Sequence, residues 1–425
     1  MTTTQPWTAP LAIDGGEPVI RRTLNRYKGA AAIGEQEKQA VMEVLERQSL
    51  FRYYGPSPLY KVQAFEQALA RFVGARHALA ASSGTAALRL GLAGLGIGPG
   101  DEVIVPAVTF IASVGAVVAA RARPVFAEVD ELLQLDPSDL ERRVTPRTKA
   151  IMPVHLNGIA VDMDPLLAFA RERGLRVIED AAQSCGSLYK GRHVGALGDV
   201  GCFSFQLEKN ITSGEGGALV TDDAEVFRRA AIYSDQGGQF WTSHAGVRDT
   251  FGGQPVIGEN LRMAEIPGAI LGCQLAKLEA ILERVERNTG VLRAALAGVS
   301  GITLPAPAPE RDRHALGALF YLPDAATADR VAEALRAEGV PAGKVYGGQP
   351  VYAARQILNQ WTIAGGCPFH CPHAFPEPIS YAMGMCPRTE DLLARGVGIG
   401  VGPFYTEEDL EDIITGVRKV AYHLL

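Results

Sequence analysis

The chain has 425 residues, of which 47% are hydrophobic and 21% charged, so it can bury a large core and is long enough for two domains. Its formal net charge of -6 comes without a block of like charge, which argues against nucleic-acid binding and against a basic membrane-facing patch. Because the first residues lack the basic start and apolar run of a signal peptide, we expect a cytoplasmic protein whose six scattered cysteines are reduced.

Short β-rich runs alternate with helical runs through the first half of the chain. The expected strands cover residues 78–82, 102–106, 124–128, 150–155, 176–180, 202–205 and 218–221. Several of these runs are apolar throughout, which is typical of strands that helices cover on both faces. The pattern predicts an α/β fold with a mostly parallel central sheet, and ligands of such sheets bind beyond the carboxyl ends of the strands.

The last third of the chain predicts a second, smaller unit. Residues 274–297 have the apolar spacing of one long bridging helix. An apolar run near 318–322 and a helix near 327–338 then indicate another α/β unit. We therefore expect a large domain over 1–290, including an N-terminal segment of no predicted structure, and a smaller C-terminal domain over 291–425.

Two strand ends carry polar groups of chemical interest. Residues 80–88 combine a strand end, a tight turn and a helix start, which suits a phosphate, although an ordinary helix cap by Ser83 or Thr85 explains them equally well. Asp180 closes a buried strand, where a carboxylate needs a partner such as a protonated pyridine nitrogen. The alternative is that Asp180 caps the following helix.

The segment Cys202-Phe-Ser-Phe-Gln-Leu-Glu-Lys-Asn-Ile-Thr-Ser-Gly-Glu-Gly-Gly217 is the most specific in the chain. It places Lys209 just beyond a strand, between hydroxyl-bearing residues and a glycine-rich turn. A lone lysine is normally a solvated surface residue. A lysine held at a sheet edge can instead lose its proton and form a Schiff base with an aldehyde.

Several short sequence blocks follow one another along the chain. They are Ser82-Ser-Gly-Thr-Ala-Ala-Leu88, Gly98-Pro-Gly-Asp-Glu-Val-Ile-Val-Pro106, Thr145-Pro-Arg-Thr-Lys-Ala150, Pro153-Val-His155, Ile178-Glu-Asp-Ala-Ala-Gln183, Phe203-Ser-Phe with Lys209 and Gly214-Glu-Gly-Gly217, and Gly258-Glu-Asn-Leu-Arg-Met263. In this order, the blocks resemble the DegT/DnrJ/EryC1/StrS family of sugar and cyclitol aminotransferases, which are fold-type I pyridoxal-phosphate enzymes. The resemblance spans most of the chain.

The resemblance implies a set of roles around pyridoxal 5'-phosphate. Lys209 would carry the cofactor as a Schiff base and move the proton, and Asp180 would pair with the pyridine nitrogen. The other implied cofactor contacts are Gln183 near the phenolic oxygen, Phe110 on the ring face, Gly84, Thr85 and Ser204 at the phosphate, and Asn260 reaching the phosphate from a neighbouring subunit. A homodimer with shared active sites follows.

The implied reaction moves an amino group from glutamine or glutamate to a ketone of a cyclitol or sugar, in aminoglycoside or other natural-product biosynthesis. The amino-acid sequence of residues 203–206 and 212–217 favours an acceptor like scyllo-inosose over a nucleotide-linked ketosugar. One alternative is a sugar dehydratase, although such relatives usually replace the lysine with histidine. Relatives that form an aromatic amino acid, amino-hydroxybenzoate, keep the lysine, and a non-catalytic protein of this fold is a further alternative.

Two other motifs each have two possible interpretations. Cys367-Pro-Phe-His-Cys371, with His373 and Cys386 nearby, has ligands suited to zinc, but its spacing is not that of a standard site. We predict no metal, and an irregular loop near the mouth of the active site. Phe51-Arg-Tyr-Tyr-Gly55 could bind a hydroxylated ring or could be a surface turn.

Overall fold

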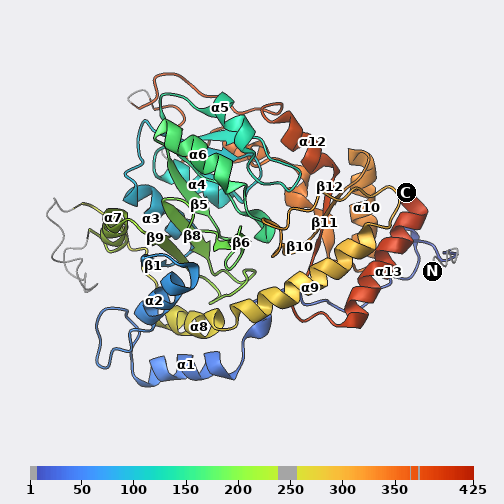
Figure 1. Ribbon diagram of the computed structural model, residues 1–425, viewed down its shortest axis with the longest axis horizontal. Helices are drawn as coiled ribbons and strands as arrows, with labels where there is room; N and C mark the ends of the chain where they lie inside the picture. The colour runs from blue at the N-terminus through green and yellow to red at the C-terminus, as the bar shows by residue number, and fades with distance from the viewer. Residues whose placement is uncertain (1–6, 238–255, 364, 372–373) are drawn as a thin grey trace.

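The computed structural model describes residues 7–237, 256–363, 365–371 and 374–425. A seven-stranded sheet forms the centre of the large domain (Figure 1). Its strands are β1 (His77–Ala81), β2 (Glu102–Pro106), β3 (Arg123–Ala127), β4 (Thr148–Ile151), β5 (Arg176–Asp180), β8 (Val200–Ser204) and β9 (Gly217–Thr221). Their order is β1-β9-β8-β5-β4-β2-β3, and β9 is antiparallel to both its neighbours while β8, β5, β4, β2 and β3 are parallel. The predicted α/β fold with a mostly parallel sheet is confirmed.

Each strand expected from the sequence is present, with small shifts at the ends. The runs 102–106 and 176–180 form strands with the same bounds. The run 150–155 differs most, because β4 ends at Ile151. Pro153 has no N–H to donate to a ladder, which explains why regular pairing stops before it.

Helices cover both faces of this sheet, and alternate strand residues enter two separate cores. In β1, Ala78 and Ala80 pack into one core while Leu79 and Ala81 pack into the other. The first core is closed by α2 (Lys61–Val73), α6 (Met163–Arg173), α8 (Glu265–Leu275) and α9 (Leu278–Leu296). The second core is closed by α3 (Gly84–Gly94), α4 (Ile111–Ala119) and α7 (Ala224–Ser234).

The long bridging helix predicted over 274–297 is present as α9, but it begins at Leu278, because Gln274 and Leu275 end α8 and the two helices meet at Ala276 and Lys277. Lys277 Nζ donates to both carboxylate oxygens of Glu37, and Gln274 Nε2 donates to one of them at 3.0 Å. The apolar spacing continues across this break, so periodicity alone did not reveal it. Helix α9 then runs from the central sheet to the smaller unit (Figure 1).

The predicted second α/β unit is confirmed. Its antiparallel sheet has the order β10-β12-β11. Its elements are β10 (Gly317–Tyr321), α10 (Ala325–Ala337), β11 (Ala342–Lys344), α12 (Pro387–Arg395), β12 (Gly396–Gly400) and α13 (Glu407–Leu424). The remaining elements are α1 (Glu35–Glu46), α5 (Leu140–Arg143), β6 (Leu188–Tyr189), β7 (Arg192–His193) and α11 (Arg355–Leu358). The domain limits 1–290 and 291–425 stay a proposal.

The N-terminal segment, which had no predicted structure, links the two units. Leu11 and Ile20 pack into the core of the smaller unit. The backbone N–H groups of Ala12 and Val19 donate to the Glu338 carboxylate, at 2.8 and 3.0 Å. The segment then crosses to the large domain, and we call residues 11–29 the N-terminal strap.

Among the described residues, no helix is both long enough and apolar enough to cross a membrane.

Candidate active site

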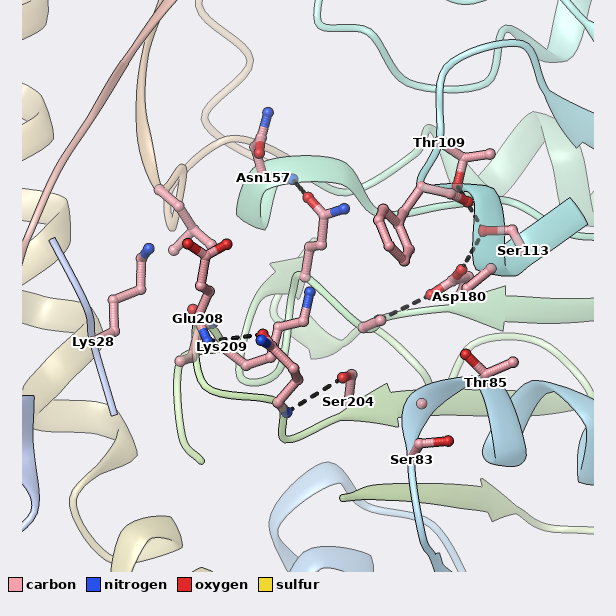
Figure 2. A pocket seen from close by; sticks show the side chains of 18 of the residues that line it. Lys28, Ser83, Thr85, Thr109, Ser113, Asn157, Asp180, Ser204, Glu208 and Lys209 are labelled. Carbon is pink, nitrogen blue, oxygen red and sulfur yellow. Dashed lines mark hydrogen bonds between the residues drawn. The ribbon is translucent and has the colours of Figure 1, made fainter. Parts of the chain in front are cut away.

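A cavity of about 790 Å³ lies at the carboxyl edge of the central sheet (Figure 2). Loops that follow β1, β2, β5 and β8 supply most of its wall, as the parallel topology requires. The smaller unit and the N-terminal strap close the rest. Predicted site residues that line it are Gly84, Thr85, Phe110, Asp180, Gln183, Ser204 and Lys209.

Lys209 lies in the loop between β8 and β9, and its side chain enters the cavity (Figure 2). Its backbone N–H donates to the carbonyl of Gln206 at 3.0 Å, which fixes the turn that carries it. Burial lowers the pKa of the Lys209 amine, and the carboxylates of Asp180, Glu208 and Glu215 oppose this shift. A lysine of this kind is more readily deprotonated, and therefore more nucleophilic, than one on the surface.

Asp180 ends β5 and is only 5% exposed. Ser113 Oγ donates to Oδ2 at 2.7 Å, and the Ala182 N–H donates to Oδ1 at 3.1 Å. Thr109 Oγ1 lies 2.6 Å from Ser113 Oγ and extends this network. Burial raises the pKa of the Asp180 carboxyl. Since no described cation forms an ion pair with it, a ligand cation at this position would offset the cost of its charge.

The N-terminus of α3 forms a cradle that suits a phosphate. Ser83 caps the helix by accepting a hydrogen bond from Ala86 N–H at 3.1 Å, so the helix-cap alternative is correct for Ser83. Gly84 packs tightly on Ser204, because a Cβ at Gly84 would lie 2.7 Å from Ser204 Cβ. Thr85 is exposed to the cavity. Hydroxyls and the positive end of a helix converge here, as anion sites require.

Phe110 and Gln183 complete the predicted wall. Phe110 is 58% exposed, which for a large aromatic beside a cavity fits a surface that stacks on a flat ring. Gln183 accepts from the Asn157 N–H at 3.2 Å and donates to the Tyr346 hydroxyl at 2.9 Å. Tyr346 belongs to the smaller unit, so Gln183 joins the two units at the cavity.

Ser113, Tyr346 and Lys28 are among the residues of this site that sequence reasoning missed. Ser113 could have been found, because it is the one hydroxyl in the otherwise apolar α4. Tyr346 and Lys28 line the cavity from segments far away in the chain, and no local pattern singled them out. Lys28 lies on the N-terminal strap near Arg26, whose guanidinium is 3.0 Å from the Glu208 carboxylate.

Asn260 does not line the cavity of its own chain. It pairs instead with Asp235 through an antiparallel bridge. This placement leaves its implied role in a neighbouring subunit untested, so that role stays a proposal.

Arg52 and Tyr53 do not line the cavity either, and Arg52 forms a buried ion pair with Glu66 at 2.8 Å. The surface-turn alternative is therefore wrong for Arg52. His155 does not line the cavity either; it is fully buried, and its Nε2 lies 2.9 Å from a Glu179 carboxylate oxygen.

The described part of the loop over 367–386 does not line the cavity, so the prediction that this loop lies at the mouth of the active site is wrong. It covers the start of β3, where Arg123 donates to the carbonyl of Phe369 at 3.0 Å. Cys386 is buried, and His373 lies outside the described residues. Within the described ranges, no three His, Cys, Asp or Glu side chains are arranged to hold a metal ion.

These observations fit pyridoxal 5'-phosphate. The cavity offers an amine of lowered pKa at Lys209, a buried carboxylate without a cation at Asp180, an exposed ring face at Phe110, and a phosphate cradle at Gly84 and Ser204. The same cofactor explains each feature, whereas a phosphate alone would explain only the cradle.

Comparison with known proteins agrees with this fit. The sequence model of the DegT/DnrJ/EryC1/StrS aminotransferase family matches residues 31–418. The chain is 34% identical to the spore coat polysaccharide biosynthesis protein SpsC of Bacillus subtilis, covering 91% of this chain and 95% of that protein. It is 35% identical to the dTDP-3-amino-3,4,6-trideoxy-alpha-D-glucose transaminase of Streptomyces venezuelae, covering 85% and 87%.

A crystal structure of DesV from S. venezuelae superposes with a TM-score of 0.76 at 33% identity, covering 91% of this chain and 94% of that one. The fold, the cavity and the sequence thus indicate one class of protein. The chain belongs to the DegT/DnrJ/EryC1/StrS aminotransferase family and is a pyridoxal-phosphate-dependent aminotransferase.

Proposed function

We propose that this aminotransferase moves an amino group from glutamine or glutamate to the ketone of a nucleotide-linked sugar. The observation that carries the proposal is the cavity itself, in which Lys209, Asp180 and the phosphate cradle face one space. Support for a nucleotide-linked acceptor comes from the name of the S. venezuelae transaminase and from Arg26 and Lys28, which suit an anionic substrate. The natural-product pathway stays a prediction.

The cyclitol acceptor favoured by the sequence of residues 203–206 and 212–217 is not confirmed. Neither relative described above has a cyclitol in its name. Scyllo-inosose carries no charge, so it would make no use of the strap cations. We therefore treat it as the second candidate and include it in the test below.

The side chains have distinct tasks in the proposed reaction. When bound, pyridoxal phosphate supplies an aldehyde that condenses with amines and a ring that accepts an electron pair. Deprotonated Lys209 Nζ takes the proton from Cα of the amino donor and returns a proton when the acceptor is aminated. Asp180 keeps its charge in order to hold a proton on the ring nitrogen, and Ser113 orients its carboxylate.

Lys209 also bears on the competing reactions. It argues against deoxygenation of the kind seen in relatives that carry histidine at this position, but it does not argue against formation of amino-hydroxybenzoate. A binding protein without catalysis would need neither a lysine of lowered pKa nor a buried carboxylate aimed at the same cavity.

We further propose a homodimer whose active sites are shared through Asn260, acting on small molecules in the cytoplasm. The implied role of Asn260 and its absence from the cavity of its own chain support this arrangement.

The test uses purified protein loaded with pyridoxal phosphate. Glutamine and glutamate are added separately, and we expect the absorbance of the pyridoxal form to convert to that of the pyridoxamine form. Nucleotide ketosugars and scyllo-inosose are then offered to the pyridoxamine form, and the acceptor is the one that restores the first spectrum. The overall reaction should show ping-pong kinetics. No spectral change with any amino donor would refute the transfer reaction.

A further inference from the structure

The N-terminal strap is fixed at both of its ends. Near its start, buried Glu338 binds the strap backbone and accepts a hydrogen bond from Lys419 Nζ at 3.0 Å. At its far end, the Gly29 N–H donates to the backbone carbonyl of Lys209 at 3.3 Å. A Cβ at Gly29 would lie 2.6 Å from Ile211 Cα, so the strap lies directly against the loop that carries the catalytic lysine.

This attachment determines where Lys28 points. Since Gly29 is held against the Lys209 loop, the residue before it is held at the cavity wall, and the Lys28 side chain lines the cavity (Figure 2). The neighbouring strap cation, Arg26, already has a partner in Glu208. Within the part of the chain that the structure describes, no acceptor forms a hydrogen bond or ion pair with Lys28. Of these two strap cations, Lys28 is therefore the one without an acidic partner among the described residues.

The surroundings of Lys28 make an anionic partner favourable. Burial lowers the pKa of its amine to about 8, the nearby cations Arg26 and Lys209 add to this effect, and Glu208 opposes it. Glu215 and Asp180 are the other acids of the cavity, and both act on Lys209. An oxyanion brought in by a substrate would restore the interactions that the amine loses on burial.

We propose that Lys28 binds the anionic group of the substrate, which is the carboxylate of the amino donor or a phosphate of the acceptor. The proposal rests on the proposed function for the identity of these substrates. Both substrates occupy the same cavity in turn, so one cation can serve either of them or both. Lys28 is then a residue that determines which substrates are accepted.

The two half-reactions separate these sources. Lys28→Met removes the charge and keeps the length of the side chain, Lys28→Arg keeps the charge, and Arg21→Met is the control. Arg21 lies on the same strap, is exposed, and forms an ion pair with Glu17. We expect Lys28→Met to raise KM by about 10- to 100-fold, the effect of losing one charge-assisted hydrogen bond, while kcat changes less.

Each outcome has a clear meaning. An increase in KM confined to the donor identifies the carboxylate, and one confined to the acceptor identifies the phosphate. Substantial rescue by Lys28→Arg and little change in Arg21→Met support a charge contact. In the wild type, affinity should fall above about pH 8 as Lys28 loses its proton, and Lys28→Arg should retain affinity there. A KM within about twofold of wild type for both substrates would overturn the proposal.

A measurement without turnover keeps the proposal testable if the reaction assigned above is wrong. Inorganic phosphate is titrated by calorimetry into protein loaded with pyridoxal phosphate, so that the cofactor cradle is already filled. We expect Lys28→Met to weaken phosphate binding about tenfold or more relative to wild type and to Arg21→Met. Equal binding by all three would refute an anion site at Lys28. Equal losses in Lys28→Met and Lys28→Arg, together with a lower melting temperature, would mean that Lys28 only supports the strap.

Discussion

Burial shifts the pKa values of Lys209 and Asp180 in opposite directions. It lowers the pKa of the amine and raises that of the carboxyl, so it drives both groups toward their neutral forms. In the proposed reaction, the neutral form is the useful one for Lys209, which would act as a base. Asp180 would need its charge in that reaction, and a cation on the ligand would offset the cost of this charge. Cofactor binding and the ionisation of Asp180 are therefore coupled.

Replacing Lys209 with Ala should reduce turnover by at least about 100-fold, because the residue that moves the proton is lost. The absorbance of covalently held cofactor should disappear as well. Far-UV circular dichroism should be unchanged, since the backbone hydrogen bonds of this turn do not need the side chain. Lys190→Ala is the control, because Lys190 lies on the surface beside Asp164. Normal turnover by the Lys209 variant would refute the central assignment.

Asp180→Asn should have opposite effects on the cofactor-free and cofactor-loaded protein. Asn can still accept from the Ala182 N–H and can donate to Ser113 Oγ, so the shape of the site is kept. Because the folded-state pKa of Asp180 is raised, the free energy of unfolding falls as the pH rises from the ordinary pKa of a carboxyl, and the loss is complete above the raised folded-state pKa. We expect a higher melting temperature than wild type without cofactor at pH 7, a difference that shrinks on acidification, and a lower one with cofactor. Thermal melts with and without pyridoxal phosphate check both signs. A lower melting temperature in both states would contradict the argument.

At the level of elements, the sequence predicted the central sheet well because the strands are short, apolar and bounded by turn residues. It also placed Lys209 and Asp180 at the cavity, since Asp180 ends β5, Lys209 follows β8, and the carboxyl ends of these two strands meet at one edge. It could not place Lys28 or Tyr346. Both lie far from the sheet loops in the chain, and their positions depend on contacts that no local periodicity records. The same limit explains why the 367–386 loop was expected near the active site, whereas its described part lies at the start of β3.

The contact between the strap and the Lys209 loop can be tested at Gly29. Its φ of -61° is ordinary, so Gly29→Ala adds no backbone strain, but the new Cβ would lie 2.6 Å from Ile211 Cα and 2.7 Å from Thr212 N. We expect a loss of about 1–3 kcal/mol in the free energy of unfolding, measured with urea, and faster proteolysis of the strap. Gly272→Ala is the control, because nothing lies within 4 Å of its added Cβ and alanine favours helix. Unchanged proteolysis at Gly29→Ala would show that the strap is not held there.

At the scale of the whole molecule, the proposed sharing of active sites makes a quantitative prediction. Lys209→Ala and Asn260→Ala should each be nearly inactive alone. If Asn260 acts in the neighbouring subunit, subunits mixed in equal amounts should recover about one quarter of wild-type activity, because half the dimers are hybrids with one complete site of two. The measurement is activity after unfolding and refolding the mixed variants. No recovery, or full activity of Asn260→Ala alone, would exclude a shared site.

The anchoring of the strap also constrains the order in which the chain can fold during synthesis. Residues 12 and 19 leave the ribosome first, yet their partner Glu338 is made more than 300 residues later, and the Lys419 that neutralises it later still. The large domain can form its sheet while synthesis continues, since domains generally fold as units. The far end of the strap can contact the Lys209 loop as soon as the large domain has formed, because Gly29 needs no residue of the smaller unit. The start of the strap cannot dock until Glu338 and α13 exist, so it is fixed last although its residues are translated earlier than their partners.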